Sequence, residues 1–199
     1  MRAPTIILAA GDFPKKGTKA YTTLAAAKRV VCCDSAADAY RKEFRRDPTL
    51  TIGDCDSVRG RFAAVVHIPE QETNDLEKAI RVCQKKGWSN LLILGATGKR
   101  EDHTLGNIFR ALDFGIPILT DFGFFHILEP NKVNRFKMSL GAALSIFAPN
   151  PKTCMTSTGL EWPLDKVRFK NLYCATLNRA TRRMVTLKTT YRAYLYEAF

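Results

Sequence analysis

The segment LLILGATGKREDH, residues 91–103, is the clearest indicator of fold class in this chain. Its first four residues are all apolar, which is typical of a parallel strand that is covered on both faces. Gly95 and Gly98 follow this strand, and glycines allow the backbone to approach a phosphate group closely. The segment therefore predicts a buried parallel strand that leads into a ligand-binding turn.

Strand-like and helix-like segments alternate on both sides of this strand, from residue 5 to residue 119. We expect strands at residues 5–10, 29–33, 50–52, 63–68, 90–94 and 116–119. We expect helices at residues 21–28, 74–86 and 104–114, and one more that follows residue 35 and ends near residue 44. This alternation predicts an α/β domain with a mostly parallel sheet. In such sheets ligands bind beyond the carboxyl ends of the strands.

The pattern changes near residue 122. Short strand-like segments separated by Pro, Asn and Gly turns follow, at residues 122–128, 134–138, 142–148, 166–172 and 184–196. No helical periodicity accompanies them. We therefore expect two domains, an α/β domain at residues 1–122 and a small all-β domain at residues 123–199.

The composition, with 46% hydrophobic and 25% charged residues among 199, is that of an ordinary globular protein. No apolar run reaches the length of about 18 residues that a transmembrane helix needs. The six cysteines form no C-x-x-C pair, so we expect reduced thiols in a reducing compartment. The net charge of +12 is compatible with nucleic-acid binding or with a solvated basic surface that also favours phosphate-bearing ligands.

Two groups of acidic residues follow predicted strands. Asp54 and Asp56 come directly after a strand and Gly53, and paired carboxylates suit Mg²⁺, although Gly and Asp are also common in surface turns. Side-chain oxygens are dense at residues 70–75, where a helix cap and its acidic first turn are the alternative explanation. Together these two groups could form one metal or substrate site.

Other polar residues lie at further strand ends. Lys99 and Arg100 offer positive charge to a phosphoryl group. Asp102 and His103 are candidates for acid–base chemistry or metal binding, with a helix cap and a structural histidine as the alternatives. The turns that hold Gly11 and Asp34 are placed where a ligand would lie.

In this order, the motifs resemble those of the thiamine pyrophosphokinase family. The resemblance runs from about residue 6 to residue 187 and rests on five segments: GDCDS at 53–57, QETNDLEKA at 71–79, GATGKREDHTLGN at 95–107, STGLEWPL at 157–164 and ATLN at 175–178. The chain departs from the family pattern at Glu70, Glu72, Asn74, Lys99 and Leu177. None of these departures removes a principal carboxylate.

The resemblance implies a fold and an activity. The first domain would be a Rossmann-like α/β domain that binds ATP, and the second a β-sandwich that binds thiamine. The enzyme would be a cytoplasmic homodimer, with thiamine bound between the subunits. It would use Mg²⁺ to transfer diphosphate from ATP to thiamine, giving thiamine diphosphate and AMP.

The resemblance also implies roles for individual residues. Metal ligands would be Asp54, Asp56 and Asp75, with Glu72 behind them. Arg100 would stabilise charge on the diphosphoryl group, and Asp102 would be the base, orient the hydroxyl or bind metal. Nucleotide-binding residues would be Gly11, Asp34, Ser35, Gly95, Thr97, Gly98 and Arg100. Substrate-binding residues would be Gln71, Asp75, Trp162, Thr176 and Asn178, although Trp162 could equally be a core residue.

Three rival functions remain at this stage. One is an ATP-dependent pyrophosphokinase or nucleotidyl transferase with a different acceptor. Another is a nucleic-acid-binding protein, for which the acidic clusters offer no reason because carboxylates repel phosphate. The third is a protein that binds thiamine or ATP for regulation without catalysis, against which the retained carboxylates argue.

Overall fold

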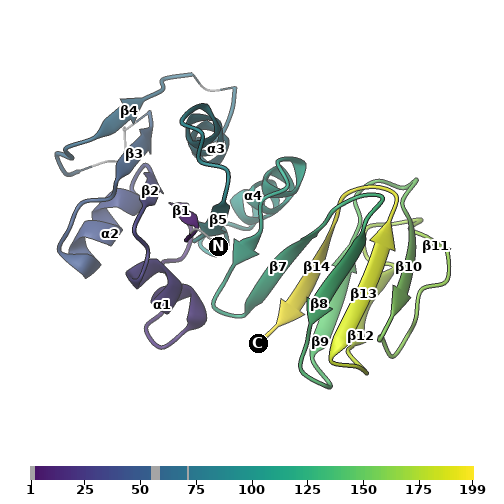
Figure 1. The fold of residues 1–199 in the computed structure, drawn as a ribbon. Coiled ribbons are helices and arrows are strands. Elements are labelled where there is room, and N and C mark those ends of the chain that lie inside the picture. The colour runs from purple at the N-terminus through teal and green to yellow at the C-terminus, as the bar shows by residue number, and fades with distance from the viewer. Residues whose placement is uncertain (1–2, 55–58, 71) are drawn as a thin grey trace. The chain divides into compact units, whose positions relative to one another are not determined.

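The fold is that of a computed structural model, which describes residues 3–54, 59–70 and 72–199 (Figure 1). The chain divides into two compact units. The first unit ends at Ala111 and also takes in Ile118–Asp121. The second consists of Leu112–Pro117 and Phe122–Phe199.

The first unit contains a parallel sheet. Its strands are β1 (Thr5–Leu8), β2 (Val30–Cys33), β3 (Leu50–Gly53), β4 (Val65–His67), β5 (Leu91–Leu94) and β6 (Ile118–Leu119). They lie in the order β6-β5-β1-β2-β3-β4, and adjacent strands pair in parallel. Strands β1, β2, β3 and β5 are buried along their whole length, as the apolar run at residues 91–94 predicted for β5.

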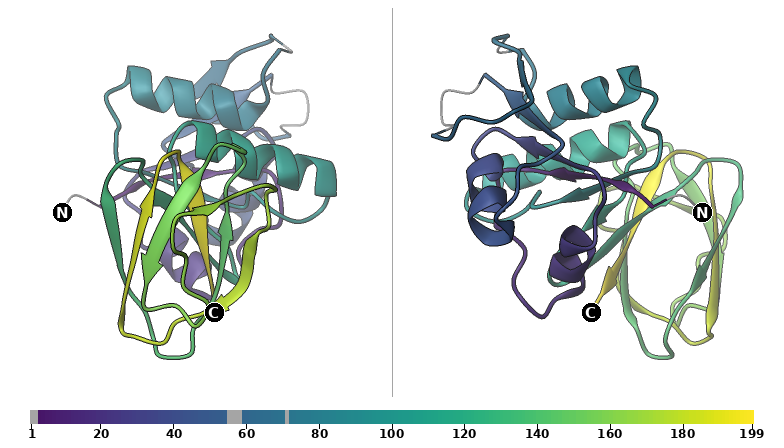
Figure 2. Two further views of the ribbon diagram at one scale, coloured as in Figure 1. Left: turned by 90° about the vertical axis from the view of Figure 1, so that its right-hand side faces the viewer. Right: turned by 60° about the vertical axis from the view of Figure 1, so that its left-hand side comes forward.

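Four helices cover this sheet in the part of the chain that the structure describes. They are α1 (Lys19–Ala25), α2 (Ala36–Phe44), α3 (Asp75–Lys85) and α4 (Glu101–Asp113). Helices α1 and α2 lie on one face of the sheet, and α3 and α4 lie on the other (Figures 1 and 2). Helix α4 begins earlier than the expected start at residue 104, because the N–H of Thr104 already bonds to the carbonyl of Arg100. Asp102 therefore lies in the first turn and is not the cap.

Helix α3 follows its sequence signals closely. The side chain of Asn74 caps it by accepting a hydrogen bond of 2.9 Å from the N–H of Glu77. Gly87 adopts a left-handed φ of 72° just beyond its end, as expected for a C-cap glycine. The residues at helical spacing, from Leu76 to Cys83, include the buried face that packs on the sheet.

The second unit is built from antiparallel strands in two layers (Figure 2). The strands are β7 (Gly123–Leu128), β8 (Val133–Lys137), β9 (Ala143–Phe147), β10 (Cys154–Thr158), β11 (Val167–Arg168), β12 (Ala175–Arg179), β13 (Met184–Thr189) and β14 (Ala193–Ala198). One layer has the order β12-β9-β14-β7 and the other β11-β10-β13-β8. Apolar side chains from both layers form a core that includes Leu128, Ile146, Phe169 and Leu187.

Some strands in this unit differ from expectation. The segment predicted at residues 184–196 is two strands, because the hydroxyl of Thr189 bonds to the carbonyl of Tyr191 and closes a turn between them. Strands β10 and β12 were not predicted, and only two residues of segment 166–172 form a strand. Even so, the α/β class with a second, antiparallel β domain is confirmed. Within the described residues, no helix is both long and apolar enough to cross a membrane.

Candidate active site

A pocket of about 590 Å³ opens at the carboxyl ends of the parallel strands. Residues that follow β1, β2, β3 and β5 line it, together with the first turns of α3 and α4. The strand order turns at β1, which has β2 on one side and β5 on the other. This is the position where ligands bind in sheets of this class. The residues that the sequence places after the strands do line a pocket there.

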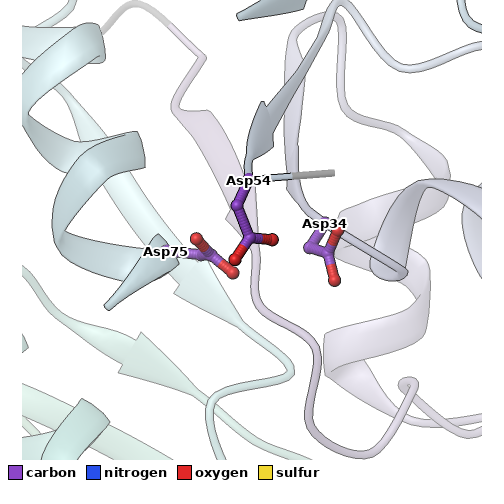
Figure 3. Close-up of side chains that lie close together, drawn as sticks. All are labelled: Asp34, Asp54 and Asp75. Carbon is purple, nitrogen blue, oxygen red and sulfur yellow. The ribbon is translucent and has the colours of Figure 1, made fainter. Parts of the chain in front are cut away.

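Three carboxylates meet in this pocket. Asp34 follows β2, Asp54 follows β3 and Asp75 begins α3, and one oxygen from each lies within 4.8 Å of the others (Figure 3). Carboxylate oxygens at this spacing suit a hard divalent cation. Asp54 and Asp75 were both predicted as metal ligands, whereas Asp34 was assigned to the nucleotide. The third predicted ligand, Asp56, lies outside the described residues.

Gly53 lies between two of these carboxylates. A Cβ atom added to Gly53 would lie 3.2 Å from the Cβ of Asp34 and 3.4 Å from the Cγ of Asp75. Asp34 itself adopts a left-handed backbone with φ of 44°, which is uncommon for a residue other than glycine. Its N–H donates to the carbonyl of Ile52 over 2.8 Å, which fixes the turn against β3.

Asp75 has two further neighbours in the pocket wall. The ammonium of Lys78 lies 3.2 Å from its Oδ1, and the Lys78 side chain is only 3% exposed. The thiol of Cys33 donates to the backbone carbonyl of Asp75 over 3.6 Å. Burial, and then the charge of Asp75, raise the pKa of this thiol well above its usual value, so it stays protonated. The sequence analysis did not assign Lys78, although its position three residues after an acid at a helix start was a usable signal.

Glycines join two turns in the wall of the pocket. The N–H of Gly11 donates to the carbonyl of Gly95 and the N–H of Asp12 to that of Thr97, each over 2.8 Å. A Cβ on Gly11 would come within 2.5 Å of the Gly95 carbonyl, so the two turns could not pack. Gly95 and Gly98 both have a left-handed φ, of 64° and 85°.

The predicted nucleotide-binding residues divide into two groups. Gly11, Asp34, Ser35, Gly98 and Arg100 line the pocket. Gly95 and Thr97 are not among the residues that line it, and they accept the backbone hydrogen bonds that join its two turns. Their contribution is therefore to loop geometry.

Arg100 and Asp102 are paired with each other. The guanidinium donates to both carboxylate oxygens, over 3.1 and 2.6 Å, and the N–H of His103 donates to Oδ1 over 2.8 Å. The Arg100 hydrogen bond, followed by that from His103, lowers the pKa of Asp102 to about 2. A carboxylate with so low a pKa is a weak base.

The predicted substrate-binding residues of the second unit are Trp162, Thr176 and Asn178, and two of them bond to nearby backbone groups. Trp162 is 56% exposed, which excludes the interpretation that it is a core residue. Asn178 is buried, and its side chain accepts from the N–H and donates to the carbonyl of Trp162, over 3.2 and 2.8 Å. The hydroxyl of Thr176 donates to the carbonyl of Tyr173. Asn178 therefore positions the backbone that carries Trp162.

Glu70 and Glu72 lie in the turn that precedes α3. Glu70 closes the turn before α3 by accepting hydrogen bonds from the N–H groups of Glu72 and Thr73, over 2.8 and 3.1 Å. Glu72 is exposed and is not among the residues that line the pocket. Gln71 lies outside the described residues.

Comparison with known proteins identifies the family. The family model for the catalytic domain of thiamin pyrophosphokinase matches residues 21–118, and the model for its substrate-binding domain matches residues 123–196. Thiamin pyrophosphokinase 1 of Caenorhabditis elegans is 26% identical over 185 residues, which cover 82% of this chain and 76% of that protein.

Solved structures match in fold. The thiamin pyrophosphokinase of Candida albicans has a TM-score of 0.79 at 13% identity, covering 98% of this chain and 89% of its own. That of Bacillus subtilis has a TM-score of 0.75 at 20% identity, covering 98% of both chains. The chain therefore belongs to the thiamin pyrophosphokinase family, and the reaction expected from its sequence, diphosphate transfer from ATP to thiamine, is the activity of that family.

Proposed function

We propose that the pocket of the first unit binds ATP with Mg²⁺ and that thiamine is the acceptor of its diphosphoryl group. The hydroxyl oxygen of thiamine forms a bond to the β-phosphorus, the bond from that phosphorus to the α-phosphate bridging oxygen breaks, and AMP leaves with that electron pair. The hydroxyl proton passes to solvent or to a phosphate oxygen. The observation that carries this proposal is the cluster of Asp34, Asp54 and Asp75 beside a glycine-built turn.

The metal would be held by Asp34, Asp54 and Asp75, together with Asp56. The donor set fits Mg²⁺, because all of these side chains offer the oxygen ligands that this ion prefers. When bound, Mg²⁺ neutralises negative charge on the triphosphate and on the migrating group. Glu72, which is exposed and does not line the pocket, would support these ligands only through the turn before α3, where its N–H bonds to Glu70.

The nucleotide would lie along the turns of Gly11, Ser35 and Gly98, with Gly95 and Thr97 shaping them. Backbone N–H groups in such turns can face phosphate oxygens without steric hindrance. Arg100 would leave Asp102 and stabilise the charge that develops between the departing AMP and the diphosphoryl group. The pair is exposed, so a triphosphate can compete for the guanidinium.

Asp102 would orient the thiamine hydroxyl by accepting its hydrogen bond. Its low pKa makes it a poor general base. Phosphoryl transfer asks little of a base, because positioning and charge neutralisation provide most of the rate enhancement. We therefore assign Asp102 an orienting role.

Thiamine would be bound between two subunits of a homodimer, with Gln71 and Asp75 from one subunit and Trp162, Thr176 and Asn178 from the other. The exposed ring of Trp162 supports this assignment, because an aromatic face attracts a cation such as the thiazolium ring. We place the enzyme in the cytoplasm, which the free thiols of Cys32, Cys33 and Cys83 support.

The test is AMP release by the purified protein with ATP and Mg²⁺, measured with and without thiamine. We expect release that requires thiamine and stops on addition of EDTA. The Asp54→Asn variant should lose activity at limiting Mg²⁺ by about 100-fold or more. ATP binding without thiamine-dependent AMP release would instead support an enzyme that uses a different acceptor.

A further inference from the structure

Lys78 places a buried positive charge beside the acidic cluster. Its side chain is 3% exposed, it lines the pocket, and its ammonium lies 3.2 Å from Oδ1 of Asp75. Lysine is almost never buried to this extent unless its charge is paired. The burial of this residue therefore calls for an explanation beyond a surface ion pair.

The position of Lys78 on α3 makes the burial more unusual. Asp75 and Lys78 are three residues apart, so they share one face of the helix. Both lie in the first turns, where the helix dipole favours anions and disfavours cations. The charge of Lys78 is therefore stabilised by the carboxylates that it faces and opposed by its own helix.

Lys78 is the buried cation nearest to Asp75 among the ion pairs of the described residues. One oxygen from each of Asp34, Asp54 and Asp75 lies within 4.8 Å of the others, and the ammonium of Lys78 lies beside Oδ1 of Asp75. Lys78 lies on the same wall of the pocket that a divalent ion and a triphosphate would share.

We propose that Lys78 is a positioning residue that acts as an internal counter-ion, so that the site takes up a divalent cation together with the polyphosphate and not ahead of it. The inference rests on the proposed function and concerns the order in which the divalent cation and the polyphosphate bind in the pocket. Lys78 holds Asp75 through Oδ1 at the edge of the acidic cluster.

Two consequences of opposite sign follow from Coulomb's law. A fixed positive charge within a few ångströms of the cluster weakens the binding of a divalent cation on its own. The same charge strengthens the binding of a metal-free polyphosphate. A residue that only supported the fold would change both affinities in the same direction.

The test uses Lys78→Met, which keeps the length of the buried chain and removes the charge. Mn²⁺ serves as the metal probe, titrated by calorimetry without nucleotide, and ATP is titrated separately in EDTA. We expect Lys78→Met to bind Mn²⁺ roughly tenfold or more tightly than the unchanged protein, and to bind metal-free ATP roughly tenfold or more weakly. Lys78→Arg, which keeps the charge, should resemble the unchanged protein in both titrations.

Lys85→Met is the matched control, because Lys85 is an exposed lysine near the end of the same helix. It should change neither affinity. Parallel weakening of both ligands by Lys78→Met, or no change in either, would overturn the counter-ion role while leaving the proposed function intact. Binding of neither Mn²⁺ nor ATP by the unchanged protein would overturn both. Thermal unfolding of each variant confirms that the titrated protein is folded.

Discussion

The guanidinium of Arg100 donates two hydrogen bonds to the carboxylate of Asp102, one of 3.1 Å from Nε and one of 2.6 Å. The sequence predicts a role in the reaction for both residues, yet in this structure the two side chains form an ion pair with each other. Their side chains are 66% and 63% exposed, so the pair is held weakly against competing ligands. We propose that entry of a triphosphate separates them, so that Arg100 binds phosphate and Asp102 binds the hydroxyl of the acceptor.

Replacing Asp102 with Asn should distinguish the role of Arg100 in binding phosphate from the role of Asp102 in orienting the hydroxyl of the acceptor. The variant frees Arg100, so we expect the KM for ATP to stay the same or fall. The kcat should drop by about 10- to 100-fold, because the hydroxyl loses its charged acceptor. Steady-state kinetics with both substrates measure the two effects. Glu101→Gln, at the neighbouring exposed acid, is the control, and an unchanged kcat for Asp102→Asn would contradict the orienting role.

The pH dependence of the reaction should not report Asp102. Its pKa is lowered from 3.8 to about 2, chiefly by Arg100, so the carboxylate stays ionised throughout the range above about pH 4. Stability contributed by the Arg100 pair is present above the ordinary pKa and is lost only as the pH falls towards 2. We expect the acidic limb of kcat/KM to be the same in the unchanged enzyme and in Asp102→Asn. A limb that disappears in the variant would show that Asp102 titrates in the working range.

Gly53→Ala should weaken the metal site as well as the fold. The new Cβ would lie 3.2 Å from the Cβ of Asp34, which is closer than an ordinary contact, so Asp34 would have to shift relative to Asp75. We expect Mn²⁺ affinity to fall by about tenfold or more, with an unfolding cost of about 1–3 kcal/mol. Gly106→Ala is the matched control, since an added Cβ there meets nothing within 4 Å. Equal Mn²⁺ affinity in the two variants would mean that the carboxylates need no such close approach.

Asn178→Ala should loosen the segment that carries Trp162. The substitution removes both side-chain hydrogen bonds to the Trp162 backbone from a buried position. We expect a loss of about 1–3 kcal/mol in the free energy of unfolding, with a change in tryptophan fluorescence. Denaturant unfolding measures the change in the free energy of unfolding. Leu177→Ala, next to it and 84% exposed, should cost less than about 0.5 kcal/mol, and equal effects would argue against a structural role for Asn178.

Much of the first unit was predictable because its signals are local. The apolar run at 91–94 became the buried strand β5, and Asn74 and Gly87 bounded α3 as their residue types suggest. The meeting of Asp54 with Asp75 followed from the rule that strand ends of a parallel sheet share one edge. These features depend on periodicity and chain direction alone.

Other features depend on geometry that no sequence pattern records. Asp34 joins the carboxylates through a left-handed backbone, and the near-complete burial of the Lys78 side chain cannot be read from its spacing to Asp75. Strand β12 was missed because a register shift between Ala175 and Asn178 leaves Leu177 outside regular alternation. Such details arise from tertiary packing, which overrides local preference.

The most direct test uses ATP that is labelled in its β- and γ-phosphates. This ATP is incubated with the purified protein, Mg²⁺ and thiamine, and the label is then located in the products. The account predicts that both labels appear in thiamine diphosphate, that the AMP formed is unlabelled, and that the two products arise in a one-to-one ratio. Label in thiamine monophosphate with ADP as the second product, or AMP formed without labelled thiamine, would contradict it.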